Sequence, residues 1–332
     1  MINSISRRKL LKAGGVLAGG TLVAKPAVLL GQAAMPRVTY VTLATGFNVI
    51  LNEYMAAKRF DLKHGVNIDV INSYVSVTNY YNDFTAGTFE LGIGAWDTWA
   101  ARFSAGVPLK LISTVTEYDM LYIVAMQGGP KTVDDLRGKI MSATLSSGAY
   151  RVTKHALSAF HKMDADKDFK VQNTESPAGA VAMVLGGSAQ GGLTWEPNVS
   201  VGLEREPKLT TIYNVGQDLQ KNTGIAFPYF SMALRDEAEK RHPGVSAKLA
   251  AAMTDCIKGV IANPDEAARL SAAKMKVSEK ALMNAFTSKR LLFKPTTMAD
   301  PKAREALLKA AAYLVKNGVL QKPVGADFLA ST

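Results

Sequence analysis

Residues 38–71 of the chain read VTYVTLATGFNVILNEYMAAKRFDLKHGVNIDVI. Val38–Leu43 is rich in β-branched and apolar residues, which predicts a strand, and Val49–Arg59 has the apolar spacing of an amphipathic helix. Val66–Ile71 predicts a second strand. A strand, a helix and a strand in this order are typical of a βαβ unit with parallel strands.

The same alternation continues along the chain. Further strands are predicted at Leu91–Gly94, Leu109–Val115, Lys139–Ala143, Phe169–Asn173, Gly191–Trp195 and Leu209–Val215. Helices are predicted up to Ala86 and at Asp97–Ser104, Val133–Leu136, Ser147–Met163 and Ala178–Leu185. Beyond Asp236 the chain is predicted to be almost wholly helical. The pattern predicts an α/β fold in which mixed, mostly parallel sheets are flanked by helices.

Two apolar runs, Leu121–Met126 and Ile225–Met232, separate one αβ series from the next. We therefore expect one lobe from residues 35–122 and 228–332, a second lobe from residues 123–227, and a hinge near 121–126 and 225–232. Two independent sequential domains are the alternative. It is less favoured, because the helical tail after residue 236 has no sheet of its own to cover.

The N-terminal residues 1–34 have the composition of an export signal. Arg7-Arg8 lie in the basic head, and a Gly-rich apolar run follows at Ala13–Ala24. The candidate cleavage region, near Gly31-Gln32-Ala33-Ala34, is rich in small residues. Paired arginines predict the twin-arginine route and hence a periplasmic protein. An ordinary secretory signal is the alternative. The apolar run is too short for a membrane anchor, which needs about 20 residues.

Composition narrows the function classes. The formal charge of +11 falls to about +6 when the five basic residues of the signal are removed. No dense Lys/Arg stripe is interleaved with aromatic residues, so nucleic acid is not expected as a partner. The single cysteine, Cys256, cannot form an internal disulfide and lies at helical spacing among apolar residues, which predicts a buried, unreactive thiol.

Aromatic, hydroxyl and charged residues gather where the predicted strands end. Open α/β sheets bind ligands outside the carboxyl ends of their strands, and small-molecule clefts combine aromatic walls with a few polar groups. Packing between sheet and helix is the alternative for any single residue. The candidate ligand-binding residues are Phe47, Asn48, Ser73, Tyr74, Trp96, Asp97, Thr98, Thr116, Glu117, Ser147, Gly148, Tyr150, Arg151, Trp195 and Glu196.

Charged candidates point to two ligand chemistries. Ser147-Gly148 opens a predicted helix, whose free amides form an anion site, and Arg151 in its first turn could pair with a carboxylate or sulfonate. The acids among the candidates favour an amine or a ring N–H instead. Capping by Ser147 and a solvated Arg151 are the alternative.

Catalytic and metal motifs are not found in the sequence. Gly92-Ile93-Gly94 lacks the remaining features of a dinucleotide fingerprint, and Phe169 stands where a calcium loop needs glycine. The four histidines are dispersed, and no nucleophile elbow or metal-spaced Cys/His set is present. Neither a cofactor nor a metal is therefore expected.

An ordered set of short motifs resembles the solute-binding proteins of ABC importers for nitrate, aliphatic sulfonates, taurine and the thiamine pyrimidine. The motifs are Phe60–Val66, Phe84–Gly92, Gly106–Lys110, Val133–Lys139 and Trp195-Glu196-Pro197. The resemblance implies a two-lobed, hinged periplasmic-binding-protein fold of type II. It also implies a non-catalytic monomer that closes on a small organic solute and delivers it to an ABC permease and its ATPase.

The resemblance has departures. Gly46-Phe47-Asn48 replaces the family's Gly-Phe-Phe, and acidic candidates do not suit a simple nitrate or sulfonate site. The expected solute is therefore left as a sulfonate, a taurine-like zwitterion, a pyrimidine or an aromatic acid. An enzyme of thiamine-pyrimidine synthesis on the same scaffold is an alternative, although its Cys-rich motif is absent. A periplasmic partner that presents its ligand to a sensor is another.

Overall fold

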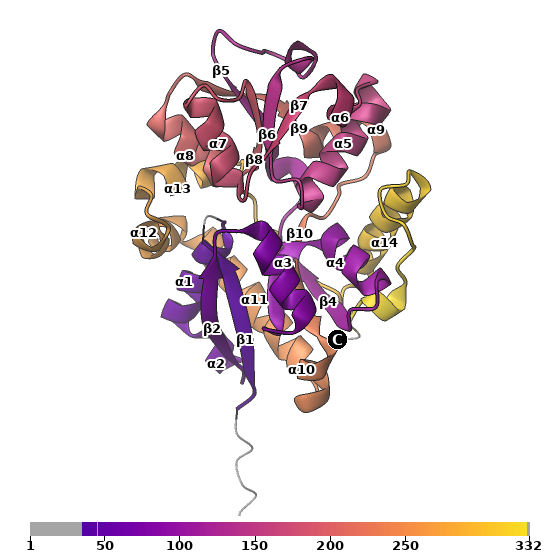
Figure 1. Ribbon diagram of the computed structural model, residues 1–332. Coiled ribbons are helices and arrows are strands. Elements are labelled where there is room, and N and C mark those ends of the chain that lie inside the picture. Colours follow the sequence, from indigo (N-terminus) through magenta and orange to yellow (C-terminus); the bar gives the residue numbers. More distant parts are fainter. Residues whose placement is uncertain (1–34, 45, 331–332) are drawn as a thin grey trace, which may run out of the picture. The chain divides into compact units, whose positions relative to one another are not determined.

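The computed structural model describes residues 35–44 and 46–330, and the predicted export signal lies outside them. Within this part the chain forms two mixed sheets with helices around each, one above the other in Figure 1. The elements of the first sheet and its helices, up to residue 114, are β1 (Arg37–Leu43), α1 (Asn48–Lys58), α2 (Phe60–Lys63), β2 (Asn67–Tyr74), α3 (Val77–Ala86), β3 (Leu91–Ala95), α4 (Trp96–Ser104) and β4 (Leu109–Thr114).

The second sheet is built from the middle of the chain. Its elements are β5 (Leu121–Met126), β6 (Ile140–Ala143), α5 (Gly148–His161), α6 (Ala165–Asp168), β7 (Lys170–Asn173), α7 (Pro177–Leu185), β8 (Gly191–Trp195), α8 (Asn198–Arg205), β9 (Leu209–Asn214) and α9 (Val215–Thr223). The short predicted helix at Val133–Leu136 is a 3-10 turn, η2 (Asp134–Leu136), and another such turn, η1 (Tyr118–Met120), precedes β5.

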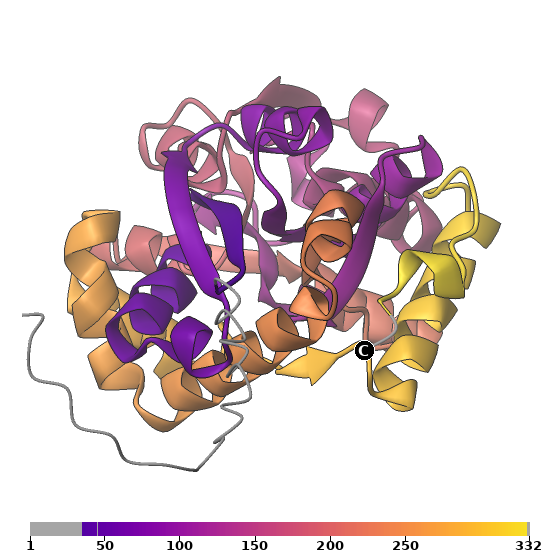
Figure 2. The same ribbon diagram turned by 90° about the horizontal axis from the view of Figure 1, so that it is seen from below.

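The last third of the chain returns to the first sheet and then becomes helical, as predicted. Its elements are β10 (Phe230–Arg235), α10 (Asp236–Arg241), α11 (Val245–Ala262), α12 (Pro264–Met275), α13 (Glu279–Thr287), β11 (Thr296–Thr297), α14 (Pro301–Lys316) and η3 (Ala326–Phe328). In the view of Figure 2 the yellow C-terminal helices lie at the right, and orange helices lie at the left and lower left. No helix in residues 35–44 and 46–330 combines the length and the apolarity needed to span a bilayer.

Strand order confirms the predicted α/β fold with two mixed sheets, but the sheets are not mostly parallel, since five of the nine strand pairs in the described residues are antiparallel. The first sheet has the order β11-β4-β10-β3-β1-β2 and the second β7-β6-β8-β5-β9. β1 pairs in parallel with β2 and β3, whereas β10 enters antiparallel between β3 and β4. In the second sheet β6 is parallel to β7 and β8, and β5 is antiparallel to its two neighbours. Both sheets are mixed, with the βαβ units supplying their parallel pairs.

The chain passes between the sheets at residues 115–120 and returns at 224–229. These two segments run side by side, because the N–H of Tyr229 donates to the carbonyl of Thr116 (2.8 Å) and that of Tyr118 to the carbonyl of Phe227 (3.1 Å). Leu121–Met126, which the sequence analysis placed in the hinge, forms β5 inside the second sheet. The first crossing therefore precedes this strand.

Close packing accounts for Gly94 in β3. A Cβ atom there would lie 2.7 Å from the ring of Trp99 and 2.5 Å from the hydroxyl of Tyr81. Trp99 is fully buried and contacts the rings of Tyr81 and Phe84. The glycine lets these rings approach the strand, which is a packing role.

The prediction for Cys256 is confirmed. Its thiol is buried in α11 and donates to the carbonyl of Leu51 (3.3 Å). Burial raises the pKa of the thiol to about 12, so the reactive thiolate is scarce at neutral pH.

Candidate functional site

Side chains from the two sheets meet at the start of α4 and α5. α4 follows β3 of the first sheet, and α5 follows β6 of the second. Each helix therefore begins at the carboxyl end of a parallel strand, where the sequence analysis expected a ligand. Of the predicted site residues, this arrangement brings together Asp97, Thr98, Gly148 and Arg151.

Asp97 is the buried centre of this group. Its side chain is 0% exposed, and its two oxygens accept from the Tyr118 hydroxyl (3.0 Å) and from Nη2 of Arg151 (2.6 Å). A Cβ atom at Gly148 would lie 2.3 Å from Oδ1 of Asp97. Because residue 148 has no side chain, the carboxylate of one lobe can approach the N-terminus of α5 in the other.

Arg151 is held by two groups of α4. Besides Asp97, its Nη2 donates to Oγ1 of Thr98 (3.0 Å). Burial alone would lower the pKa of the guanidinium, but the neighbouring Asp97 carboxylate raises it above its ordinary value. The buried Nε has no hydrogen-bond partner in the described part of the chain. The side chain is 35% exposed and lines a cavity of about 410 Å³ together with residues of α4 and of 319–322.

Aromatic rings fill the space next to the two crossing segments. Phe230 lies at 4.8 Å from Phe47, 5.8 Å from Trp195 and 4.3 Å from Tyr229 between ring centroids. Tyr229 also stacks on Tyr118 at 4.2 Å. Two predicted residues, Phe47 and Trp195, therefore share one buried aromatic cluster that contains rings of both crossing segments.

Trp96 lies beside this cluster. Its backbone N–H donates to the carbonyl of Tyr229 (2.9 Å), and its side chain is fully buried. The indole Nε1 has no hydrogen-bond partner among the described residues, and the same is true of Oδ1 of Asn48 and the hydroxyls of Ser113 and Ser231. Buried polar atoms are usually paired with protein, water or ligand, and these four lack a partner within the described residues.

Glu196 is buried in a separate ion pair. Its carboxylate is 0% exposed and accepts from Nε of Arg290 (2.6 Å) and from the backbone N–H (3.1 Å) and hydroxyl (2.9 Å) of Ser200. Burial raises its pKa above the usual value, against the opposing effects of Arg290 and Ser200. This network ties the end of β8 to the segment after α13.

Two predicted residues of the first crossing segment are engaged within the chain. Glu117 forms an ion pair with Lys294. Thr116 is buried, and its Oγ1 accepts from the backbone N–H of Phe230 (3.3 Å). Lys294 in turn donates its backbone N–H to the carbonyl of Val115 (2.8 Å), so a third segment, after α13, runs beside the crossing.

The other predicted residues are exposed or form hydrogen bonds with partners other than Asp97. Ser73 is exposed on β2, and the Tyr74 hydroxyl donates to Asp83 of α3. Tyr150 donates its hydroxyl to Asp166, a contact inside the second lobe, and Ser147 caps α5 by accepting the N–H of Tyr150 (3.2 Å). Nδ2 of Asn48 donates to the carbonyl of Ile93 (3.1 Å).

Sequence reasoning missed the partners of the charged candidates. Arg290 and Lys294 lie in a stretch predicted only as part of the helical tail, and Tyr118 was not named at all. The positive charges of Arg290 and Lys294, and the helix-breaking Pro295 beside them, can be seen in the sequence. No local pattern, however, indicates which acids they pair with. The cation for each acid comes from a distant part of the chain.

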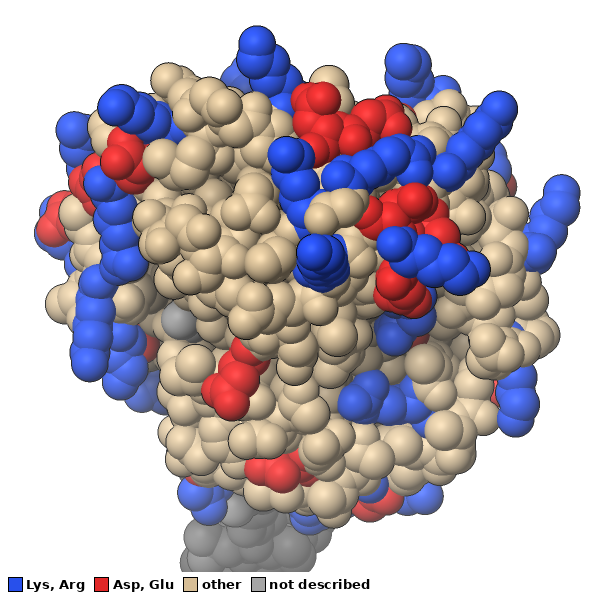
Figure 3. Space-filling view, turned by 45° about the horizontal axis from the view of Figure 1, so that its top comes forward, with Lys and Arg blue, Asp and Glu red and all other residues tan. Residues whose placement is uncertain are grey.

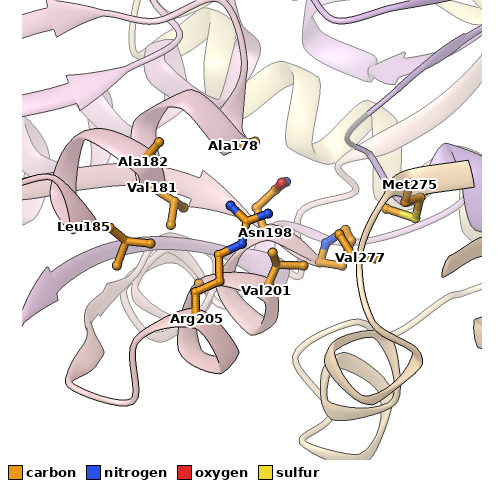
Figure 4. A pocket seen from close by; sticks show the side chains of 11 residues that line it. Ala178, Val181, Ala182, Leu185, Asn198, Val201, Arg205, Met275 and Val277 are labelled. Carbon is orange, nitrogen blue, oxygen red and sulfur yellow. The ribbon is translucent and has the colours of Figure 1, made fainter. Parts of the chain in front are cut away.

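A second, smaller cavity of about 90 Å³ lies between α7, α8 and the residues joining α12 to α13. Figure 4 shows Val181 and Leu185 on one side, Met275 and Val277 on the other, and the side chains of Val201 and Arg205 between them. The walls are mainly apolar. None of the predicted site residues lines this cavity.

Charge is mixed on the face shown in Figure 3, where Lys and Arg lie among Asp and Glu. Within residues 35–44 and 46–330, no three His, Cys, Asp or Glu side chains are grouped so that they could hold a metal ion.

Comparisons with known proteins show the fold. No protein-family model matches the chain, and no curated protein matches its sequence. Among solved structures, the periplasmic aliphatic sulphonate binding protein of Escherichia coli is similar at 15% identity and a TM-score of 0.67, over 88% of this chain and 90% of that one. The alkanesulfonate-binding protein of Xanthomonas axonopodis pv. citri, bound to MOPS, is similar at 14% identity and a TM-score of 0.69, over 86% and 95%.

A Candida albicans protein described as having the generic periplasmic binding protein fold is similar at 14% identity and a TM-score of 0.65, over 88% of this chain and 93% of that one. The described chain therefore has the periplasmic-binding-protein fold. The fold that the resemblance implied is confirmed.

Proposed function

We propose that this protein is the extracytoplasmic solute-binding component of an ABC importer, and that it captures a small organic solute between its two lobes. The observation that carries the proposal is the buried contact of Asp97 with Arg151. It joins groups from the carboxyl ends of strands in two different sheets, which is where ligands bind in α/β folds. The similar structures named as sulfonate-binding proteins support the same role.

Closure of the lobes would enclose the solute. The segments 115–120 and 224–229 would act as the hinge, because they connect the sheets and hydrogen-bond to one another. Contacts across the interface are present in the structure: Oγ1 of Thr78 donates to Oγ of Ser146 (2.9 Å), and the N–H of Val77 to the carbonyl of Glu175 (3.0 Å). These contacts would form when the lobes close and separate when they open.

The solute site would combine apolar and polar groups. Trp96 and Trp195 would supply aromatic surface, and the unpartnered indole N–H of Trp96 would donate to the solute. Asp97, Arg151 and the N-terminus of α5 would hold its charged groups. Sulfonates, taurine-like zwitterions, pyrimidines and aromatic acids are the classes to be tested.

We also propose export to the periplasm and delivery of the solute, by a monomer, to an ABC permease and its ATPase. Arg7-Arg8 support the twin-arginine route. Replacing both arginines by lysine, with cell fractionation as the readout, should leave the protein in the cytoplasm. Unchanged export would favour an ordinary secretory signal.

Intrinsic fluorescence tests the binding role, because two tryptophans lie near the interface and the third lies in the core. A Trp96→Phe/Trp195→Phe variant, which retains Trp99 alone, should show no response to a binding solute. The wild type should respond with a saturable change, and the solute should raise the melting temperature. If no solute of the four classes or of a metabolite extract changes either signal, the proposed function is wrong.

A further inference from the structure

The pairing of Asp97 with Arg151 restricts the charge of the solute. The two side chains come from opposite lobes and meet at 2.6 Å, so opening of the lobes must separate them. Asp97 is 0% exposed and accepts from one other side chain, the neutral hydroxyl of Tyr118. When Arg151 is taken away, this hydroxyl alone faces a buried carboxylate.

Arg151 is also incompletely partnered. Its buried Nε has no partner in the described part of the chain, and its side chain lines the cavity of about 410 Å³. Apolar residues such as Ala101, Ala105 and Leu320 form other walls of this cavity. Its charged lining residues are Arg151 and Lys322, and both are basic. The guanidinium can therefore bind an acidic group of a solute in place of Asp97.

A singly charged solute would pair with one member of the Asp97–Arg151 pair and leave the other member without an opposite charge. An anion bound to Arg151 would leave the Asp97 carboxylate buried without its cation, and an amine bound to Asp97 would leave Arg151 without its anion. Buried charges are tolerated when they are paired. A solute with both charges replaces one ion pair by two and strands neither group.

We infer that the solute is a zwitterion, an amino acid or an aminosulfonate, whose acidic group binds Arg151 at the N-terminus of α5 and whose ammonium group binds Asp97. In the structure, the Asp97 carboxylate itself lies beside Gly148 at the N-terminus of α5. The inference rests on the proposed function and deepens it, since it names the solute class of the same site. Gly148 fits this role, because its missing side chain leaves room for either the Asp97 carboxylate or a solute acid.

Matched triads of small molecules test the inference on the signal-free protein. Each triad contains a zwitterion, its deaminated acid and its amine: taurine with ethanesulfonate and ethylamine, 4-aminobutanoate with butanoate and butylamine, and phenylalanine with 3-phenylpropanoate and phenethylamine. Calorimetry and thermal shift give the affinities. Native mass spectrometry after incubation in a metabolite extract identifies the captured solute.

The zwitterion of at least one triad should bind about 10-fold or more tightly than both counterparts. Asp97→Asn should weaken zwitterion binding by about 10–100-fold and leave the binding of the acid unchanged or stronger. Arg151→Gln, at a partly exposed position, should abolish the preference for the zwitterion over the amine. Asp255 lies on α11 and forms a partly exposed pair with His64. Asp255→Asn is the matched control and should change none of these affinities.

The inference is overturned if the captured solute carries a single charge or none, or if the acid binds as tightly as the zwitterion and Asp97→Asn leaves their ratio unchanged. In either case a solute is bound, and the proposed function stands. Absence of any retained solute or triad binding overturns both.

Discussion

Two buried carboxylates, Asp97 and Glu196, each meet an arginine at 2.6 Å, yet their surroundings differ. Glu196 is part of a closed network: it accepts from Arg290 and twice from Ser200, and Arg290 Nη2 donates to the Ser200 hydroxyl (3.0 Å). Asp97 has only Arg151 and a tyrosine hydroxyl, and Nε of Arg151 is unpartnered.

Position explains the difference. Arg290 is 21% exposed and joins the segment after α13 to the end of β8, whereas Arg151 is 35% exposed and borders a cavity of about 410 Å³. The Glu196 carboxylate accepts three hydrogen bonds, and both of its donor residues, Arg290 and Ser200, are bonded to each other, so this network acts as a brace. Both pairs join the two lobes, but the Asp97 pair has fewer hydrogen bonds, an unpartnered Arg151 Nε within the described residues and a neighbouring cavity, so it suits a ligand site. A buried carboxylate–arginine pair can therefore be a structural brace or part of a ligand site, according to how completely its hydrogen bonds are satisfied.

The largest effect is expected from Arg290→Met. It strands the fully buried Glu196, and removal of one partner of a buried pair costs about 3–5 kcal/mol. For a chain of this size, that loss lowers the melting temperature by roughly 5–8 °C. Calorimetric unfolding measures it.

Arg151→Met is the matched variant for this comparison. Arg151 is 35% exposed and Arg290 is 21% exposed, so the loss in melting temperature should be clearly smaller than for Arg290→Met, whereas solute binding should fall sharply. Equal losses of stability in the two variants would show that both pairs are structural braces.

Gly148→Ala should have an intermediate effect, and on binding more than on folding. The new Cβ would lie 2.3 Å from Oδ1 of Asp97 and force the carboxylate away from Arg151. We expect solute affinity to fall about 10-fold and stability to fall by about 1 kcal/mol, at the lower end for overpacked sites.

Gly179→Ala in α7 is its control. The nearest atoms to a Cβ there lie at 3.5 Å, which is ordinary contact, and alanine favours the helix. This variant should bind normally and be as stable as the wild type or more so. If Gly148→Ala behaves in the same way, Asp97 does not need the space.

The smallest effect concerns pH. His155 of α5 hydrogen-bonds with the hydroxyl of Tyr313 on α14 (3.0 Å), and burial lowers its pKa below the usual 6.5. A lowered pKa stabilises the fold above the unfolded value and loses that contribution as the pH falls through the folded one. Between pH 7.5 and 5.5 the melting temperature should therefore fall by about 1 °C through this residue.

Melting curves of His155→Gln at both pH values measure that contribution. His242→Gln, at the end of α10, is the control and should retain the full pH dependence of the wild type. A His155→Gln variant with the same dependence would assign the effect to other groups.

Local pattern predicted most of the fold. Apolar spacing located the βαβ units, but α8 (Asn198–Arg205) and the two-residue β11 were missed, because α8 is short and follows Glu196-Pro197, and β11 is defined by its pairing with β4. Strand ends indicated where Asp97 and Arg151 would lie. Their mutual pairing, and that of Glu196 with Arg290, depends on tertiary contacts between segments up to 94 residues apart, which spacing along one sequence does not encode.

Closure of the lobes around a solute can be followed directly with pyrene labels at Val75→Cys and Leu145→Cys. These positions are 54% and 41% exposed and lie near the contact of Thr78 with Ser146, while Cys256 is buried and should not react. We predict that a binding solute raises excimer emission saturably, with the midpoint of calorimetric binding. Constant excimer emission during saturation with a solute that calorimetry shows to bind would contradict the account.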